Sequence, residues 1–222
     1  MIPLKDDLPT RTFPFVTIAL IAINIVVFFY EVSLGPRAEA MIFRHGAIPF
    51  NLIYGIERGQ SPIPIVLSLF TSMFLHGGFM HVAGNMLYLW IFGNNIEDVM
   101  GHLRFIFFYF ICGVAAVYSH ALIDSASQVP MIGASGAVSG VLGAYLLLFP
   151  HAKVLTLVPI FFFIQIIRVP AVIVLGLWIV VQFVNGFFGI GQIGGVAWFA
   201  HIGGFLVGMV LIYPFKKRKR RA

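Results

Sequence analysis

The stretch IGASGAVSG, residues 132–140, decides how this chain folds, because it joins one serine to two glycines spaced four residues apart. On a helix Gly136 and Gly140 share a face, and small residues at this spacing let a second membrane helix approach closely. Ser135 stands directly before that face, between small neighbours that leave its hydroxyl accessible. A helix that begins here also directs free backbone N–H groups and the positive end of its dipole toward the serine. The stretch therefore predicts a helix-packing surface with a candidate nucleophile at its head.

A matching stretch, AHIGGFLVG, occupies residues 200–208. Gly204 and Gly208 repeat the four-residue spacing, and His201 precedes them much as Ser135 precedes its own pair. If the two glycine faces pack together, Ser135 and His201 meet at about the same depth in the membrane. The plainer interpretation, compatible with the first, is that the glycines serve helix packing alone.

The composition of the whole chain is that of a membrane protein. Its 222 residues are 60% hydrophobic and 10% charged, with a mean hydropathy of +0.99, whereas about 25% of a soluble domain is charged. The net charge is +6, but six basic residues form the terminal run 216–221. Such a run after an apolar span indicates contact with anionic lipid rather than nucleic acid. The single cysteine, Cys112, excludes an intrachain disulfide and a thiolate metal cluster.

The apolar runs predict an all-α, polytopic bundle of six transmembrane helices in a single domain, residues 1–222. The expected spans cover residues 14–30, 81–94 (continuing a run from 65), 103–123, 136–149, 169–184 and 198–213. The apolar stretch 154–167 predicts a loop or the oblique start of the fifth span, because Pro159, Arg168 and Pro170 interrupt it. The glycine-rich stretch 185–195 predicts the hinge between the last two spans.

The basic residues orient these spans. The terminal run places the tail 216–222 in the cytoplasm, and an even number of spans places the N-terminal tail 1–13 there as well. We therefore expect a multi-pass protein of the cell membrane, of the bacterial inner membrane type, with both termini cytoplasmic. The first outer connection, residues 31–64, is long and carries both charge signs beside apolar pieces. Its length and content predict a structured loop that rests partly in the outer interface.

Polar side chains gather in three of the apolar runs. His81 and Asn85 are four residues apart and share one helix face, while Ser135 and His201 head the two glycine faces. Each has an ordinary structural interpretation, since an intramembrane serine usually bonds its own helix and a lone histidine can bridge two helices. Together they supply the nucleophile, base and oxyanion donors that acyl transfer requires.

These residues resemble the rhomboid family of intramembrane serine proteases, in its compact six-span prokaryotic form. The resemblance covers nearly the whole chain after the N-terminal tail, and its motifs occur in the family's order. The matching pieces are residues 76–85 (His-x4-His-x3-Asn), 97–105, 133–136 and 200–208. The resemblance implies a Ser–His dyad, in which Ser135 attacks the scissile carbonyl and His201 accepts and later returns the proton. His81, Asn85 and the Ser135 backbone N–H would hold the oxyanion.

Two further positions match the family and two features depart from it. His76 matches a position near the active-site mouth, and Gly133 one whose backbone orients substrate or lies near the oxyanion. Some members carry an aromatic residue one turn after the nucleophile, packed on the imidazole, where this chain has Ser139, so the sequence leaves open what orients His201. The first loop also lacks a Trp-Arg pair that some members carry. No Asp or Glu lies within the predicted core spans, which agrees with a dyad that has no acidic third member.

The function that follows is an endopeptidase that cleaves transmembrane segments of other proteins near their outer ends, with no cofactor and no metal. Substrates would enter between spans two and five, or before span five, and carry small or helix-destabilising residues near the cut. Two alternatives stay open: a non-catalytic, rhomboid-like binder of transmembrane helices, and a small transporter. A transporter would need a polar path or inverted repeats, and neither is evident. The HExxH motif of a metalloprotease is missing.

Overall fold

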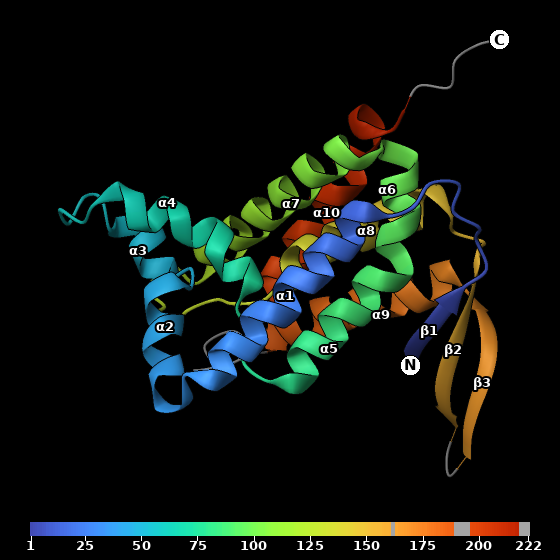
Figure 1. Cartoon of the computed structure of the whole chain (residues 1–222), viewed down its shortest axis with the longest axis horizontal. Coiled ribbons are helices and arrows are strands. Elements are labelled where there is room, and N and C mark those ends of the chain that lie inside the picture. The colour runs from blue at the N-terminus through green and yellow to red at the C-terminus, as the bar shows by residue number, and fades with distance from the viewer. Residues whose placement is uncertain (161–162, 189–195, 218–222) are drawn as a thin grey trace.

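The structure, a computed structural model, describes residues 1–160, 163–188 and 196–217 (Figure 1). Four of its helices are long and apolar enough to cross a membrane: α1 (Phe15–Ser33), α7 (His102–Ile123), α9 (Ala171–Phe188) and α10 (Trp198–Phe215). The shorter α8 (Ser135–Leu148) is the most enclosed, with every residue from Gly136 to Tyr145 buried. The predicted polytopic helical bundle is confirmed, and these five helices begin and end within a few residues of the expected spans.

The second span differs from its prediction, because the apolar run from residue 65 to 94 is not one continuous helix. It begins with α4 (Pro62–Thr71) and a 3-10 turn (Ser72–Phe74), and resumes with α5 (Phe79–Tyr88), a π-helical turn (Leu89–Gly93) and α6 (Asn94–Met100). The two halves are bent by 82°. Gly77 and Gly78 lie at the bend, and adjacent glycines favour a helix break there. Counted as one span, this pair brings the candidate spans to five, and the six-span count, which needs the short α8, stays a prediction.

The stretch 154–167 forms strands, so the prediction of a loop or helix start was wrong there. β2 (Lys153–Ile160) and β3 (Phe163–Pro170) form an antiparallel hairpin, and β1 (Ile2–Asp6) adds to the free edge of β2. The stretch is rich in β-branched residues, which favour strands. Pro159 lies near the turn end of β2, where its missing N–H does least harm to the ladder. The predicted N-terminal tail thus contains an ordered strand.

The connection 31–64, predicted to be a structured loop, contains helices. It contains a 3-10 turn (Gly35–Arg37), α2 (Ala38–His45) and α3 (Pro49–Tyr54). Ala47 and Met131 exchange backbone hydrogen bonds of 3.0 and 2.9 Å, which tie this loop to the segment that leads into Ser135.

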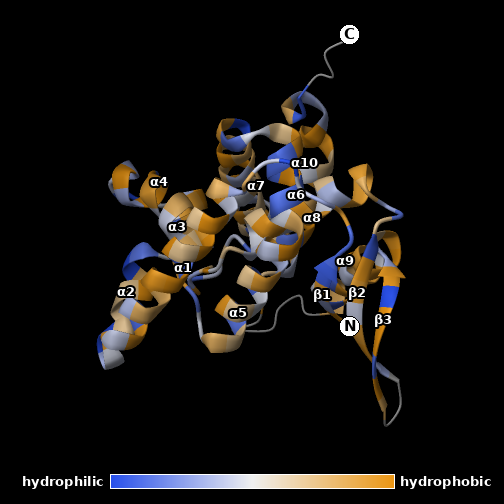
Figure 2. Ribbon diagram, turned by 45° about the vertical axis from the view of Figure 1, so that its right-hand side comes forward, coloured by the Kyte–Doolittle hydropathy of each residue, from blue (hydrophilic) through white to orange (hydrophobic). Residues whose placement is uncertain are grey.

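Two acidic residues are buried in the helices, so the expectation of acid-free core spans was wrong. Glu31 is 3% exposed, because α1 continues past Tyr30, and its carboxylate accepts the His76 backbone N–H at 3.1 Å. Glu97 lies in α6, one of the hydrophilic segments in Figure 2, and is fully buried. It accepts the backbone N–H groups of Val16 and Thr17 at 3.0 and 2.8 Å. Glu97 therefore caps the N-terminus of α1, where a negative charge is favourable.

Helices α8 and α10 pack through their glycines. A Cβ on Gly204 would lie 2.1 Å from the carbonyl oxygen of Gly136, and one on Gly208 would lie 2.0 Å from that of Gly140. Real Cβ atoms do not approach that closely, so only glycine permits this contact. The structure thus brings all four glycines together, and the heads of the two helices with them.

Of the predicted hinge 185–195, Asn185 and Gly186 lie inside α9, which runs to Phe188. Positions 189–195 fall outside the described residues, as do positions 218–222 of the basic C-terminal tail.

Candidate active site

Ser135 and His201 occupy the first turns of the two packed helices. Ser135 is the first residue of α8, and His201 is the fourth residue of α10. The Ser135 Oγ and the His201 Nε2 are 2.8 Å apart, within hydrogen-bonding distance. Helix packing through glycine thus places a hydroxyl against an imidazole at a half-buried position between the two helices.

A third side chain fixes the protonation pattern of this pair. The His201 Nδ1 lies 2.7 Å from the Oε1 of Gln182 on α9. The Gln182 Nε2 donates to the Trp178 carbonyl at 3.1 Å, so Oε1 is the atom left to accept from His201. The Nδ1 therefore carries the imidazole proton, and the Nε2 accepts from the Ser135 hydroxyl. This is the tautomer that a general base requires.

Gln182 was not predicted as a site residue from the sequence. A single amide in an apolar helix carries no motif, and its partner lies on another helix. One signal was available, because Gln182 is the only amide side chain in the apolar run 169–184. A buried polar group inside a membrane span is commonly functional.

The position of Ser139, one turn after the nucleophile, does not orient His201. The Ser139 hydroxyl donates to the Ser135 carbonyl at 2.6 Å, a bond within its own helix. The imidazole instead lies beside the rings of Trp178 and Trp198, with centroids 5.9 and 6.2 Å away. The aromatic contacts that the family can supply from the nucleophile's helix thus come here from α9 and α10.

The structure also brings His76, His81 and Asn85 together near the residues that precede Ser135. The Asn85 Nδ2 donates to the His76 Nε2 at 3.0 Å, and the His76 and His81 rings are 5.0 Å apart. The Gly77 N–H donates to the His81 Nδ1 at 3.4 Å, a long bond that leaves the proton on Nε2. His81 and Asn85 thus each present an N–H donor, and His76 orients the asparagine.

Gly133 meets these donors directly. A Cβ at this position would lie 2.7 Å from the His81 Nε2 and 3.6 Å from the Asn85 Nδ2. Its φ of +118° is a conformation that residues with side chains rarely adopt. Its own N–H donates to the Ser72 carbonyl at 2.9 Å. Gly133 is therefore the point at which the nucleophile's loop contacts the donor cluster, two residues before Ser135.

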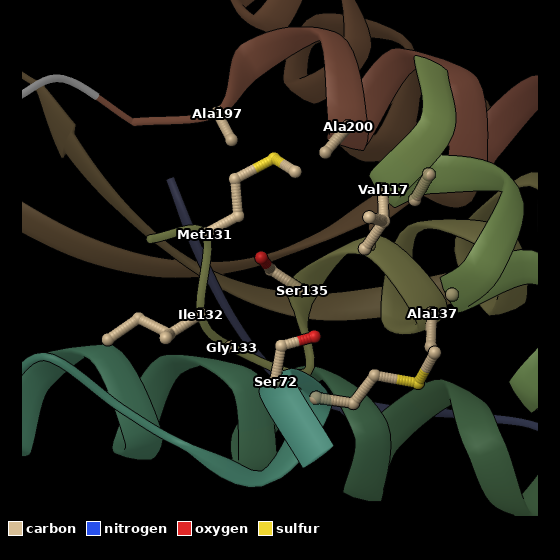
Figure 3. A pocket seen from close by; sticks show the side chains of 13 residues that line it. Ser72, Val117, Met131, Ile132, Gly133, Ser135, Ala137, Ala197 and Ala200 are labelled. Atoms are coloured by element: carbon tan, nitrogen blue, oxygen red, sulfur yellow. The ribbon is translucent and has the colours of Figure 1, made fainter. Parts of the chain in front are cut away.

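A cavity of about 30 Å³ opens beside Ser135 (Figure 3). A cavity of this size is large enough to hold a water molecule or a small side chain. Most of its lining is small or apolar, and it includes Val117, Met131, Ala137, Ala197 and Ala200. The space next to the hydroxyl accordingly suits a small side chain.

The fold and the site together define a class, a polytopic helical membrane protein that holds a hydrogen-bonded, half-buried serine and histidine within its bundle. Residues 65–218 match the model of the Rhomboid domain, and the chain belongs to the rhomboid family. The matched region contains the serine, the histidine, the glutamine and the donor cluster.

Curated relatives point the same way. The chain is 38% identical over 96 residues to Rhomboid protein 1, mitochondrial, of Saccharomyces cerevisiae, a match that covers 41% of this chain and 28% of that protein. It is 33% identical over 143 residues to Rhomboid protease GluP of Bacillus subtilis, covering 64% and 25%. It is 27% identical over 136 residues to the Putative rhomboid protease YdcA of Bacillus subtilis, covering 61% and 63%. The chain thus spans less than two thirds of the length of each.

Proposed function

We propose that this protein is an intramembrane serine endopeptidase with a Ser135–His201 dyad. The observation that carries the proposal is the 2.8 Å contact between the Ser135 Oγ and a His201 Nε2 whose other nitrogen is already hydrogen-bonded. As Ser135 attacks the scissile carbonyl, its proton passes to the His201 Nε2, which then protonates the leaving amine. Water, activated by the same imidazole, hydrolyses the acyl-enzyme and frees Ser135.

The donor cluster would stabilise the oxyanion of each tetrahedral intermediate. The His81 Nε2–H and the Asn85 amide lie against Gly133, and the Ser135 backbone N–H is unused by α8 because it opens the helix. Preformed donors of this kind contribute about 10²–10³-fold each to the rate. A water-filled site would weaken them, whereas the apolar bundle limits competing water.

The substrates in this proposal are transmembrane segments of other membrane proteins. The small cavity beside Ser135 supports cleavage after small residues, such as alanine or glycine. The route between α5 and α9 supplies entry from the lipid, and the cut lies toward the outer end of the substrate. The protein spans a cell membrane of the bacterial inner membrane type, and both termini lie on its cytoplasmic side. There the basic C-terminal tail contacts anionic lipid.

Cleavage of one model transmembrane substrate in detergent tests the proposal, together with labelling by a fluorophosphonate probe. Ser135→Ala and His201→Ala should abolish both signals while thermal unfolding stays close to that of wild type. Ser139→Ala is the matched control, because its hydroxyl bonds only its own helix, and it should keep most of the activity. Normal cleavage by Ser135→Ala would refute the proposal. A folded wild type that neither cleaves nor labels would favour the non-catalytic binder.

A further inference from the structure

The helix α9 supplies two of the contacts that hold the catalytic imidazole. Gln182 accepts its Nδ1–H at 2.7 Å, and Trp178, one turn earlier, lies beside the ring. Among the four long apolar helices α9 is the least buried. The other half of the dyad's environment comes from α8 and α10, which are locked by their glycines. The orientation of His201 thus depends in part on the long helix that has the smallest buried share within the bundle.

We infer that Gln182 is a positioning residue of the dyad, an uncharged third member delivered by α9; this inference rests on the proposed function. Its amide is itself fixed, because Nε2 donates to the Trp178 carbonyl and the oxygen can only face His201. Gln182 is 5% exposed, and an ionised carboxylate in its place would be costly to bury inside the membrane. An amide gives the same acceptor geometry without that charge.

A consequence is that α9 must be packed against α10, with Gln182 bonded to His201, for Ser135 to be activated. When α9 separates from α10, the His201 Nδ1 loses its acceptor, and the imidazole is free to rotate or change tautomer. One hydrogen bond therefore links the position of α9 to proton transfer at the dyad.

Steady-state kinetics on Gln182→Leu, Gln182→Glu and Asn185→Leu test this inference. Gln182→Leu keeps the volume and removes the acceptor, so kcat should fall by about 10–100-fold with KM within about twofold. Gln182→Glu restores an acceptor beside the imidazolium that forms during the reaction; that pairing offsets the cost of the buried charge, so a substantial part of kcat should return. Asn185→Leu makes the same change one turn further along α9, at a side chain that is not one of the two hydrogen-bond partners of His201, and should resemble wild type.

The outcomes separate this inference from the function on which it rests. If Ser135→Ala is inactive and Gln182→Leu is normal, the role of Gln182 is wrong while the protease stands. Equal losses in Gln182→Leu and Gln182→Glu, or an equal loss in Asn185→Leu, would indicate packing and overturn the acceptor role. An active Ser135→Ala would overturn both proposals.

The β-sheet carries a second inference, independent of the active site. One face of the sheet packs on the bundle along β2, where Val154 and Thr156 are 0% exposed, while Ile167 of β3 on the same face is 40% exposed. Directly paired residues of antiparallel strands share a face, so the register assigns the opposite, outward face. Its apolar members include Ile2, Leu157, Pro159, Ile164 and Ile166, of which Ile164 is 71% exposed. An outward sheet face would normally be polar.

This outward face lies at the end of a membrane span. β3 ends at Pro170 and α9 begins at Ala171, with no linker between them. The first turns of α9 expose Val172, Ile173 and Leu177. The apolar surface thus continues from a span onto the sheet, at the depth where hydrocarbon gives way to headgroups. Figures 1 and 2 show the largely hydrophobic hairpin pointing away from the C-terminus, toward the side on which α5 lies.

The charged strand residues on this face are all basic, and one acidic residue lies near them, Asp7 just past β1, whose carboxylate accepts the Lys153 backbone N–H at 2.9 Å. Lys5, Lys153 and Arg168 lie on it, at the end next to α9, and β2 and β3 contain no acidic residue. Basic residues beside an apolar surface are the pattern of segments that lie in the interface of anionic membranes. A partner protein would need acidic residues placed opposite these three cations, whereas the phosphates of an anionic membrane present negative charge over the whole surface.

We propose that the outward face of the sheet docks on the membrane, with its apolar residues among the upper acyl chains and its three cations on lipid phosphates. The test uses spin labels at Ile164→Cys, Ile166→Cys, Leu177→Cys and Glu57→Cys, each with Cys112→Ala, in vesicles containing phosphatidylglycerol. Labels at 164 and 166 should resemble the lipid-facing position 177, accessible to oxygen and shielded from a nickel complex. The label at 57, in the exposed outer loop, gives the aqueous reference.

Labels at 164 and 166 that match position 57 in nickel accessibility would place the sheet in water and refute the docking. Labels shielded from both reagents would indicate a protein partner or a second copy instead, which also refutes it. Lys153→Gln combined with Arg168→Gln should raise nickel accessibility at 166 by about twofold or more in the anionic vesicles. An unchanged value would overturn the role of the cations.

Discussion

The imidazole of His201 is held by groups from three helices: Ser135 from α8, Gln182 from α9, and Trp198 from its own helix. Glycine spacing predicted the contact between Ser135 and His201, because both glycine pairs are visible in the sequence. Gln182 could not be predicted in the same way, since its partner is chosen by the packing of α9 on α10. The same holds for the bond between Asn85 and His76, which links the two ends of one motif across the bend.

The cavity beside Ser135 predicts a change in cleavage preference. Val117, on α7, forms part of its wall, and Val117→Ala removes two methyl groups at a stability cost of about 1.5 kcal/mol or more. The ratio of kcat/KM for substrates with valine and with alanine at the cut should rise about tenfold. Val114→Ala, on the same helix but outside the cavity lining, is the control. An unchanged ratio would exclude this cavity as the site of the substrate side chain.

Among the elements, the contact between α8 and α10 makes a prediction about stability. Gly208→Ala places a methyl group 2.0 Å from the Gly140 carbonyl oxygen, so the helices must separate, at a cost of about 1–3 kcal/mol. The Ser135–His201 distance grows with them and activity falls. Gly176→Ala, where a Cβ meets nothing within 4 Å, should be neutral or stabilise by up to about 1 kcal/mol. Thermal unfolding in detergent measures both, and equal effects would contradict the packing argument.

The long apolar helices could be predicted from hydropathy because each one makes its backbone hydrogen bonds within its own segment, as the membrane interior requires. The elements that were mispredicted depend on partners instead. The sequence of β2 and β3 is apolar and does not by itself distinguish a strand from a loop or helix. β1 forms a strand only because it pairs with β2, which lies far along the chain. The bend between α4 and α5 was visible only as a pair of glycines, and its 82° angle follows from the packing around it.

In the molecule as a whole, Asp6 joins the sheet to the bundle and should make stability depend on pH. It accepts hydrogen bonds from Asn95 at 2.6 Å and from the Tyr145 hydroxyl at 2.7 Å. Burial nevertheless raises the pKa of the Asp6 carboxyl above its ordinary value of 3.8. As the pH rises from 3.8 through that raised pKa, the folded protein loses a proton that the unfolded chain has already lost. The free energy of unfolding therefore declines across this window.

Asp6→Asn, which stays neutral, should remove this decline and equal or exceed wild type in stability above the window. Unfolding temperatures between pH 4 and 7 give the comparison. Asp124→Asn, at an exposed position, should keep the pH dependence of wild type. A wild-type profile that rises with pH where Asp6→Asn is flat would contradict the assigned direction.

Cys112 offers a measure of the integrity of the whole bundle. It is the chain's single cysteine, it is 0% exposed, and it lies where α7 meets Gly140 of α8. A maleimide should therefore fail to label the native protein and react fully after denaturation in SDS, as mass spectrometry would show. Gly208→Ala should label faster than wild type, because it separates the neighbouring helices. Rapid labelling of the native wild type would show that the bundle opens readily.

The pairing of β1 with β2 also determines when during synthesis the sheet can form. Ile2 leaves the ribosome well before its partner Leu157, which is made about 155 positions later. At roughly 5–20 residues per second, the first strand waits about 8–30 s for the second. During that interval most of the helices enter the membrane while β1 has no edge to join. The sheet therefore closes late, and its closure marks a nascent chain that has already been threaded as far as α8.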